Sequence, residues 1–310
     1  MGNTPEEKKF NSKHILLIAV ISAIYLAVSA IFIGFKVEQL VLVCLFWIMY
    51  LASAPSRKII LGFSVFIAYW VIFDYMKLLP NYDVNNVHIK DLYDHEKNLF
   101  GVNYRGVVLT PHELFEKYQN PAFDLMSGLF YLCWVPVPIF LAAYLFYKNR
   151  MEFLKFSLTF LWINLIGFVI YYIYPAAPPW YIENYGTIFK AATPGNTAGL
   201  ARFDMLVGVR IFHSLYSQSS NVFAAMPSLH SAYPLLVLYY GLKNKLGLVN
   251  ILFSIIMIGI WLSAIYTGHH YLLDVIAGII VCIIGIISFN RIIKWQPITK
   301  WLQSYFKLIS

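Results

Sequence analysis

The sequence predicts an all-α polytopic membrane protein with about eight transmembrane helices. Of its 310 residues, 60% are apolar and only 12% are charged, whereas soluble domains are roughly half apolar and a quarter charged. A soluble fold of this size has too few charged side chains to cover so much apolar surface. A series of apolar runs, each near the roughly 20 residues needed to span a bilayer, supports the same class. Disordered, collagen-like and disulfide-stabilised folds are excluded.

Eight apolar runs define the expected spans. The second is shortened by Glu38, and the sixth contains Pro227 and Pro234, which a span tolerates when neighbouring helices satisfy the freed carbonyl. In order, the runs are Ile15–Phe35, Val37–Ala54, Ile59–Leu79, Phe123–Tyr147, Phe156–Tyr174, Pro227–Leu242, Leu248–Thr267 and His270–Asn290. We expect an N-terminal transmembrane hairpin over residues 1–58, a six-helix core over 59–290 and a cytoplasmic basic tail over 291–310.

The charges indicate how the chain is oriented. Eight spans place both termini on one side, and that side carries 14 of the 23 basic residues but only 3 of the 15 acidic ones. The positive-inside rule therefore places both termini in the cytoplasm. The net charge of +8 reflects topology, and we expect no nucleic-acid partner. The absence of an N-x-Ser/Thr acceptor favours a bacterial cytoplasmic membrane over a glycosylating pathway.

The two long connections, residues 80–122 and 175–226, lie on the outer side in this topology. They contain aromatic and periodic apolar residues, so we expect ordered elements along the outer membrane interface. The cytoplasmic connections are too short to build a site, which places any chemistry on the outer face. His88, His95 and His112 have no partner at motif spacing, and we expect them to be surface residues.

Two segments carry the residues with the strongest chemical signal. His270 and Asp274 are four residues apart, so they share one face at the start of a helix. A carboxylate beside an imidazole sets its tautomer and stabilises its cation, which a nucleophilic histidine requires. In the other segment, Pro227 suits a first helical turn and puts His230 in it. We expect both helix starts to direct free N–H groups at one phosphate.

These segments resemble the second and third signatures of the type 2 phosphatidic acid phosphatase superfamily. The second is Pro227-Ser-Leu-His230, and the third runs from Ser263 through His270 to Asp274. Within the superfamily the chain is most similar to the inositol phosphorylceramide synthase branch. Further matches are Tyr174-Pro-Ala-Ala-Pro-Pro-Trp180, Gly199-Leu-Ala-Arg-Phe-Asp204, Phe223-Ala-Ala-Met226 before the second signature, and the doubled histidine His269-His270.

The resemblance implies a role for each of three residues. His270 would attack phosphorus and form a phosphohistidine, Asp274 would orient His270, and His230 would act as general acid and then general base. It also implies that the six-helix core is the catalytic part. No metal or other cofactor is expected, and the adjacent imidazoles of His269 and His270 diverge on a helix and make poor joint metal ligands.

The departures from the pattern bear on the substrate. The phosphatases place an arginine where this chain has Ala264, and their lysine and Arg-Pro signature is replaced by Tyr174-Pro175. A phosphodiester carries less charge than a phosphomonoester and needs fewer cationic residues, so a diester donor is favoured. Candidate substrate-binding residues are Ser228, Arg202, Arg210, Asp124, Tyr174, Trp180 and His269.

The function that the resemblance implies is transfer of phosphoinositol from phosphatidylinositol to ceramide, with release of diacylglycerol. Three alternatives stay open: a lipid phosphatase or phosphodiesterase that uses water as acceptor, a sphingomyelin-synthase-like transferase with another head group, and a transporter or scaffold with a degenerate enzyme fold. The expected partners are these two lipids and the membrane, and no obligate protein partner is evident.

Overall fold

The computed structural model describes residues 12–217 and 221–310, and it confirms the all-α membrane class. The described chain forms two compact units, one up to Leu78 together with Trp301–Ser310, the other Leu79–Lys300. The third predicted span, Ile59–Leu79, lies almost entirely in the first unit, and the predicted N-terminal hairpin over residues 1–58 stays a prediction. The composition of the catalytic core as six helices stays a prediction.

The first unit consists of apolar helices with polar connections. It contains α1 (Ser12–Phe32), α2 (Val37–Ala52), α3 (Ala54–Tyr75), η1 (Met76–Leu78) and most of α15 (Gln296–Ile309). Ser53 ends α2 and caps α3, because its hydroxyl accepts the Ser56 N–H at 3.2 Å. Tyr305 of α15 donates to the Leu61 carbonyl at 2.7 Å. The predicted cytoplasmic tail thus includes a helix that packs against α3.

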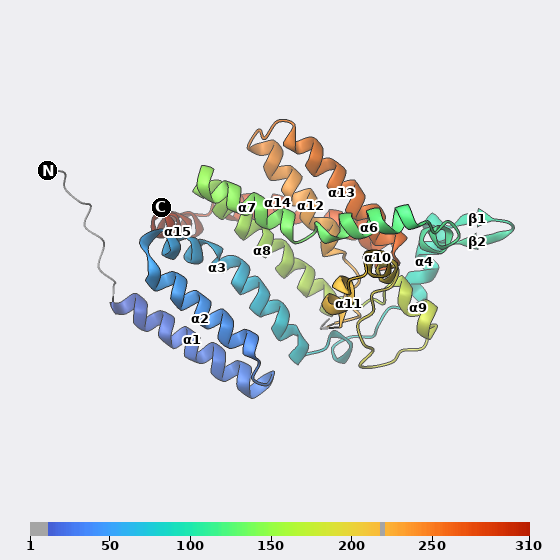
Figure 1. The fold of residues 1–310 in the computed structure, drawn as a ribbon, viewed down its shortest axis with the longest axis horizontal. Coiled ribbons are helices and arrows are strands. Elements are labelled where there is room, and N and C mark those ends of the chain that lie inside the picture. The colour runs from blue at the N-terminus through green and yellow to red at the C-terminus, as the bar shows by residue number, and fades with distance from the viewer. Residues whose placement is uncertain (1–11, 218–220) are drawn as a thin grey trace. The chain divides into compact units, whose positions relative to one another are not determined.

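The second unit is built around a group of apolar helices (Figure 1). These are α6 (Pro121–Leu132), α7 (Pro136–Lys148), α8 (Arg150–Ile173), α12 (Leu229–Lys243), α13 (Val249–Tyr266) and α14 (Leu272–Ile292). Helix α12 contacts α7, α8, α13 and α14, whereas α6 packs on α13. This packing brings the first turns of α12 and α14 together, although 40 residues separate His230 from His270.

Six described stretches are long and apolar enough to cross a membrane. Two of the eight predicted spans form shorter helices: α2 has 16 residues and α12 has 15. A third predicted span is interrupted between α6 and α7, because Pro136 and Pro138 lack the N–H groups that would continue the helix. The apolar runs therefore predicted the helical segments well but overestimated the length of two of them.

The two long connections that are predicted to lie on the outer side, called the outer connections below, are ordered over the residues that the structure describes. They contain η2 (Asn81–Asp83), α4 (Lys90–Phe100), β1 (Val102–Tyr104), β2 (Val107–Leu109), α5 (Pro111–Glu116), α9 (Pro179–Tyr185), α10 (Leu200–Val207) and α11 (Ile211–Tyr216). The β1–β2 hairpin was not predicted. Its turn uses Arg105 and Gly106, both with positive φ, as a tight hairpin turn requires.

Two single-residue parallel β-bridges join the two outer connections. His88 bridges to Ala176, and Ala176 bridges to Ala224, both in parallel orientation. The Ala176 N–H donates to the Phe223 carbonyl at 2.8 Å, and the Ala225 N–H donates to the Ala176 carbonyl at 3.3 Å. These hydrogen bonds hold the backbone at Ala225 against Ala176, directly before the segment that carries His230.

Asn81 should be a major contributor to stability in this region. Its side chain is fully buried and donates to the carbonyls of Tyr171 (2.9 Å) and Phe223 (2.8 Å). Asn81→Leu removes this donor from the Tyr171 carbonyl and leaves the Phe223 carbonyl with the Ala176 N–H alone, so we expect the free energy of unfolding to fall by about 1–3 kcal/mol. Thermal unfolding in detergent measures this. The matched control is Asn85→Leu, which removes an exposed hydrogen bond from the Asn85 side-chain amide to the Tyr172 carbonyl. Equal melting temperatures for the two variants would contradict the role assigned to Asn81.

Candidate active site

The first turns of α12 and α14 form the framework of the site. The backbone N–H of Ser228 donates to the Asp274 carbonyl at 2.9 Å, so the segment that precedes α12 is hydrogen-bonded directly to α14. Gly278, one turn further along α14, allows this approach, because a side chain there would collide with the Ser228 carbonyl. His230 and Asp274 therefore project from adjoining helix starts.

The structure brings His230, His270 and Asp274 together. Nε2 of His270 lies 3.2 Å from Nδ1 of His230, and Nδ1 of His270 lies 3.5 Å from Oδ2 of Asp274. His270 and Asp274 are buried, and His230 is half-buried. One ring nitrogen of His270 thus faces the carboxylate while the other faces the second imidazole, the arrangement that a supported nucleophile beside an acid–base group requires.

Burial determines the resting protonation of His270. Because the ring is almost fully removed from solvent, its pKa falls to about 4. The imidazole is therefore neutral near pH 7, and a neutral ring has the lone pair that attacks an electrophile. Asp274 is held in place as well, since its Oδ2 accepts the Tyr271 N–H at 2.8 Å.

The prediction that α14 directs free N–H groups at a phosphate is wrong. Glu96 of α4, which is fully buried, accepts the N–H groups of Leu272 and Leu273 at 2.9 and 3.0 Å. Burial raises the pKa of Glu96, the two N–H donors oppose that shift, and the Asp274 charge adds to it. A carboxylate from the first long connection therefore already occupies the α14 terminus.

Asp124 and Arg202, two candidate substrate-binding residues, pair with each other. Nε of Arg202 donates to Oδ1 of Asp124 at 2.6 Å, and the Tyr266 hydroxyl donates to the same oxygen at 2.9 Å. The Arg202 guanidinium also lies over the Tyr266 ring. Asp124 is buried, so this pairing offsets the cost of its charge. Arg210 is exposed at the start of α11.

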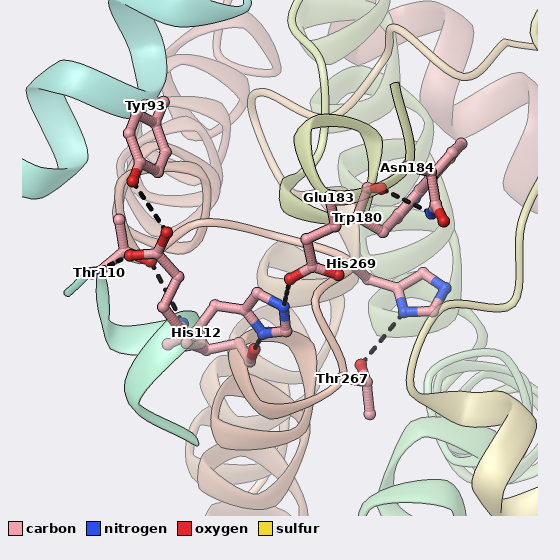
Figure 2. A network of polar contacts seen from close by, with 10 residues as sticks. Tyr93, Thr110, His112, Trp180, Glu183, Asn184, Thr267 and His269 are labelled. Atoms are coloured by element: carbon pink, nitrogen blue, oxygen red, sulfur yellow. Dashed lines mark hydrogen bonds and ion pairs between the residues drawn. The ribbon is translucent and has the colours of Figure 1, made fainter. Parts of the chain in front are cut away.

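Each of the remaining candidates contacts residues other than the three of the triad. Tyr174 stacks on the His88 ring with centroids 3.7 Å apart. Trp180 is buried, and its backbone N–H donates to the Gly268 carbonyl at 3.1 Å. Ser228 is buried and accepts from the Ser231 hydroxyl. His269 is buried, with Nδ1 3.1 Å from the Thr267 hydroxyl (Figure 2).

Of the three histidines expected at the surface, His95 is exposed and His88 is half-buried. The expectation is wrong for His112, which is 4% exposed. Figure 2 shows His112 between α9 and the end of α13, with one ring nitrogen toward Glu183. These partners lie 71 and 153 residues away in the chain, so no motif spacing pointed to them.

Two aromatic residues near the triad were missed by sequence reasoning. Tyr131 is fully buried in α6, with its ring centroid 5.1 Å from that of His230 and 5.4 Å from that of His269. Trp134 meets His230 edge-on at 4.6 Å. Trp134 lies just after the end of α6, in the break before α7, so its closeness to Tyr131 in the sequence was the available signal, and apolar spans are rich in aromatic residues. Together they limit the orientations open to His230.

Comparison with known proteins identifies the family. The model of the PAP2 superfamily matches residues 106–288, more than half of the chain. A phosphoinositol dihydroceramide synthase from Bacteroides thetaiotaomicron is 43% identical over 302 residues, which cover 96% of this chain and 99% of the relative.

Fungal relatives are more distant. The inositol phosphorylceramide synthase of Candida albicans is 30% identical over 62% of this chain and 40% of its own length. The inositol phosphorylceramide synthase catalytic subunit of Saccharomyces cerevisiae is 32% identical over 59% of this chain and 44% of its own length. No solved structure matches the chain significantly. The motif resemblance is thus confirmed, and the chain belongs to the PAP2 superfamily.

Proposed function

We propose that this multi-pass membrane protein transfers phosphoinositol from phosphatidylinositol to ceramide or dihydroceramide and releases diacylglycerol. The observation that carries the proposal is the His230–His270–Asp274 geometry, in a chain that resembles a phosphoinositol dihydroceramide synthase over almost its whole length. Both substrates are lipids, so a site at the membrane surface keeps the inositol near water and the acyl chains in the bilayer.

The first half-reaction forms a covalent intermediate. Nε2 of His270 attacks phosphorus, and the bond from phosphorus to the diacylglycerol oxygen breaks. His230, which enters this step protonated, gives its proton to the leaving oxygen. The His270 ring becomes positively charged as the N–P bond forms. Nδ1–H then donates to Asp274, whose carboxylate stabilises that charge and keeps the ring oriented.

The second half-reaction regenerates the enzyme. His230 is now neutral and takes the proton of the ceramide hydroxyl. The resulting oxygen attacks phosphorus, the N–P bond breaks, and His270 returns to its neutral form. Each half-reaction exchanges one phosphorus bond for another and moves one proton, so the cycle balances with the two lipids alone.

The surroundings support a phosphodiester donor. Ala264, which replaces the arginine of the phosphatases, is fully buried in an apolar cluster with Tyr131, Leu200 and Phe203. A guanidinium at this position would lose its hydration without a carboxylate to pair with. A monoanionic diester therefore suits this side of the site better than a dianionic monoester.

The topology that we propose follows the charge distribution. Both termini lie in the cytoplasm, and the triad lies on the outer face of a bacterial cytoplasmic membrane. The starts of α12 and α14 both adjoin the outer connections, which supports a single outer site.

Removal of the nucleophile should abolish transfer. We expect His270→Ala to lower kcat by roughly 10⁴-fold or more and Asp274→Asn by roughly 10²–10⁴-fold, because the first removes the attacking atom and the second removes the charge that orients it. Turnover of labelled phosphatidylinositol by purified protein measures both. His95→Ala, at an exposed histidine of α4, is the control. Near-normal turnover by His270→Ala, together with loss of turnover on chelation, would require a metal-dependent mechanism instead.

The acid side of the pH profile should report His270. The attacking form is the neutral ring, and its pKa is about 4, below the ordinary histidine value of about 6.5. We expect kcat/KM for the donor to fall on the acid side as pH drops through about 4, because a protonated ring has no lone pair for attack. A loss of activity with its midpoint near pH 6.5 would contradict a buried, neutral nucleophile.

The acceptor distinguishes the proposed transferase from its alternatives. With phosphatidylinositol as donor, we expect inositol-containing sphingolipid to form only when dihydroceramide is added, and EDTA to leave the rate unchanged. Mass spectrometry of the lipid extract and of the water-soluble head groups follows both products. Head-group release at an equal rate without dihydroceramide would identify a hydrolase, and no turnover of either kind would favour a transporter or scaffold.

A further inference from the structure

The loop between α13 and α14, Thr267–Tyr271, carries His270 and is here called the nucleophile loop. Its first two carbonyls accept backbone N–H groups from the second outer connection. Gly199 donates to Thr267 at 2.8 Å, and Trp180 donates to Gly268 at 3.1 Å. The position of His270 therefore depends on segments that are far from it in sequence and outside the membrane spans.

The His112 ring lies directly against this loop. Its Nδ1 donates to the carbonyl of Ile265, in the last turn of α13, at 2.9 Å. Gly268 has a positive φ of 72°, and a Cβ there would approach Cε1 and Nε2 of His112 to 2.6 and 2.7 Å. The glycine thus meets two demands, since it adopts a left-handed backbone and leaves space for the ring. His112 contacts the loop two residues before His270.

Glu183 completes the contact from α9. Nδ1 of His112 carries a hydrogen, because a carbonyl oxygen can only accept, and Nε2 lies 2.5 Å from Oε1 of Glu183. At this distance the His112 ring and the Glu183 carboxyl group share a direct hydrogen bond. His112 is buried, whereas the Glu183 side chain is 36% exposed.

A metal ion explains this contact less well than a proton does. Ligand-type atoms of His112, Glu116 and Glu183 lie within 4.8 Å of one another. Zinc bonds of about 2.0–2.2 Å in tetrahedral geometry hold two ligand atoms roughly 3 Å or more apart. The 2.5 Å separation of Nε2 and Oε1 is that of a direct hydrogen bond.

We propose that the His112–Glu183 pair is a positioning device for the phosphotransfer reaction, which holds Gly268 and thereby the ring of His270 at its distance from His230. The inference rests on the proposed function. Neither side chain touches His230, His270 or Asp274 by any hydrogen bond or ion pair in the described part of the chain. Loss of the pair should therefore change how often His270 is aligned for attack and leave substrate binding largely intact.

Three variants test this in full-length protein in detergent. Glu183→Ala removes the acceptor from a partly exposed position and should fold. Glu183→Gln keeps a carbonyl oxygen that can accept from Nε2 of His112 and serves as the conservative rescue. His112→Gln removes the ring from its contact with Gly268. Glu116→Gln, an exposed glutamate on the same helix as His112, and His95→Gln, an exposed histidine of the same outer connection, are the matched controls.

We expect Glu183→Ala and His112→Gln to lower kcat by about 10- to 100-fold with KM changed by less than about threefold, since small misplacements of a reacting group cost rates of this order. Glu183→Gln should recover most of the wild-type kcat, and the controls should match wild type. The melting temperature of Glu183→Ala should stay near that of wild type.

Three results would overturn the proposal: a kcat for Glu183→Ala equal to that of the controls, a loss of kcat only in proportion to unfolded protein, or a bound metal ion that both variants release. Failure of the proposed function is a separate outcome, because wild type itself would then show no dihydroceramide-dependent transfer.

Discussion

The starts of α12 and α14 must stay side by side, because His230 on α12 and His270 in the loop directly before α14 can then face one phosphorus atom. A backbone hydrogen bond from Ser228 to Asp274 holds the two starts together, and Gly278 removes the side chain that would keep them apart. Because the contact is made by main-chain atoms, it leaves the side chains of His230 and Asp274 free to face His270. The proposed chemistry depends on this approach.

The outer connections form part of the framework that holds the nucleophile loop. Glu96 binds the first N–H groups of α14, Trp180 and Gly199 hold the loop carbonyls, and His112 fills the space beside Gly268. These elements lie outside the long apolar helices, where hydrophobic burial alone does not specify a unique arrangement. Hydrogen bonds to backbone groups provide that specificity and satisfy polar atoms that would otherwise be costly to bury.

The fold class, most helical segments and the residues of the triad could be predicted from the sequence because each has a local signal. Apolar runs reveal helices, and the spacing of four residues predicted that His270 and Asp274 lie close together, although His270 lies in the loop before α14 and not on a helical face. The positions of Glu96 and His112 could not be predicted, because their partners lie 176 and 153 residues away and no periodicity connects them. For the same reason the start of α14 looked open to phosphate. A helix N-terminus is judged free or occupied only once distant segments are in place.

The covalent intermediate offers the most direct test of the account. Purified protein is mixed with phosphatidylinositol in the absence of acceptor, quenched under alkaline conditions that preserve N–P bonds, digested and analysed by mass spectrometry. The account predicts an inositol phosphate adduct on His270 that disappears when dihydroceramide is added before the quench. An adduct on another residue, or transfer at the full rate with no adduct at any time during turnover, would contradict it.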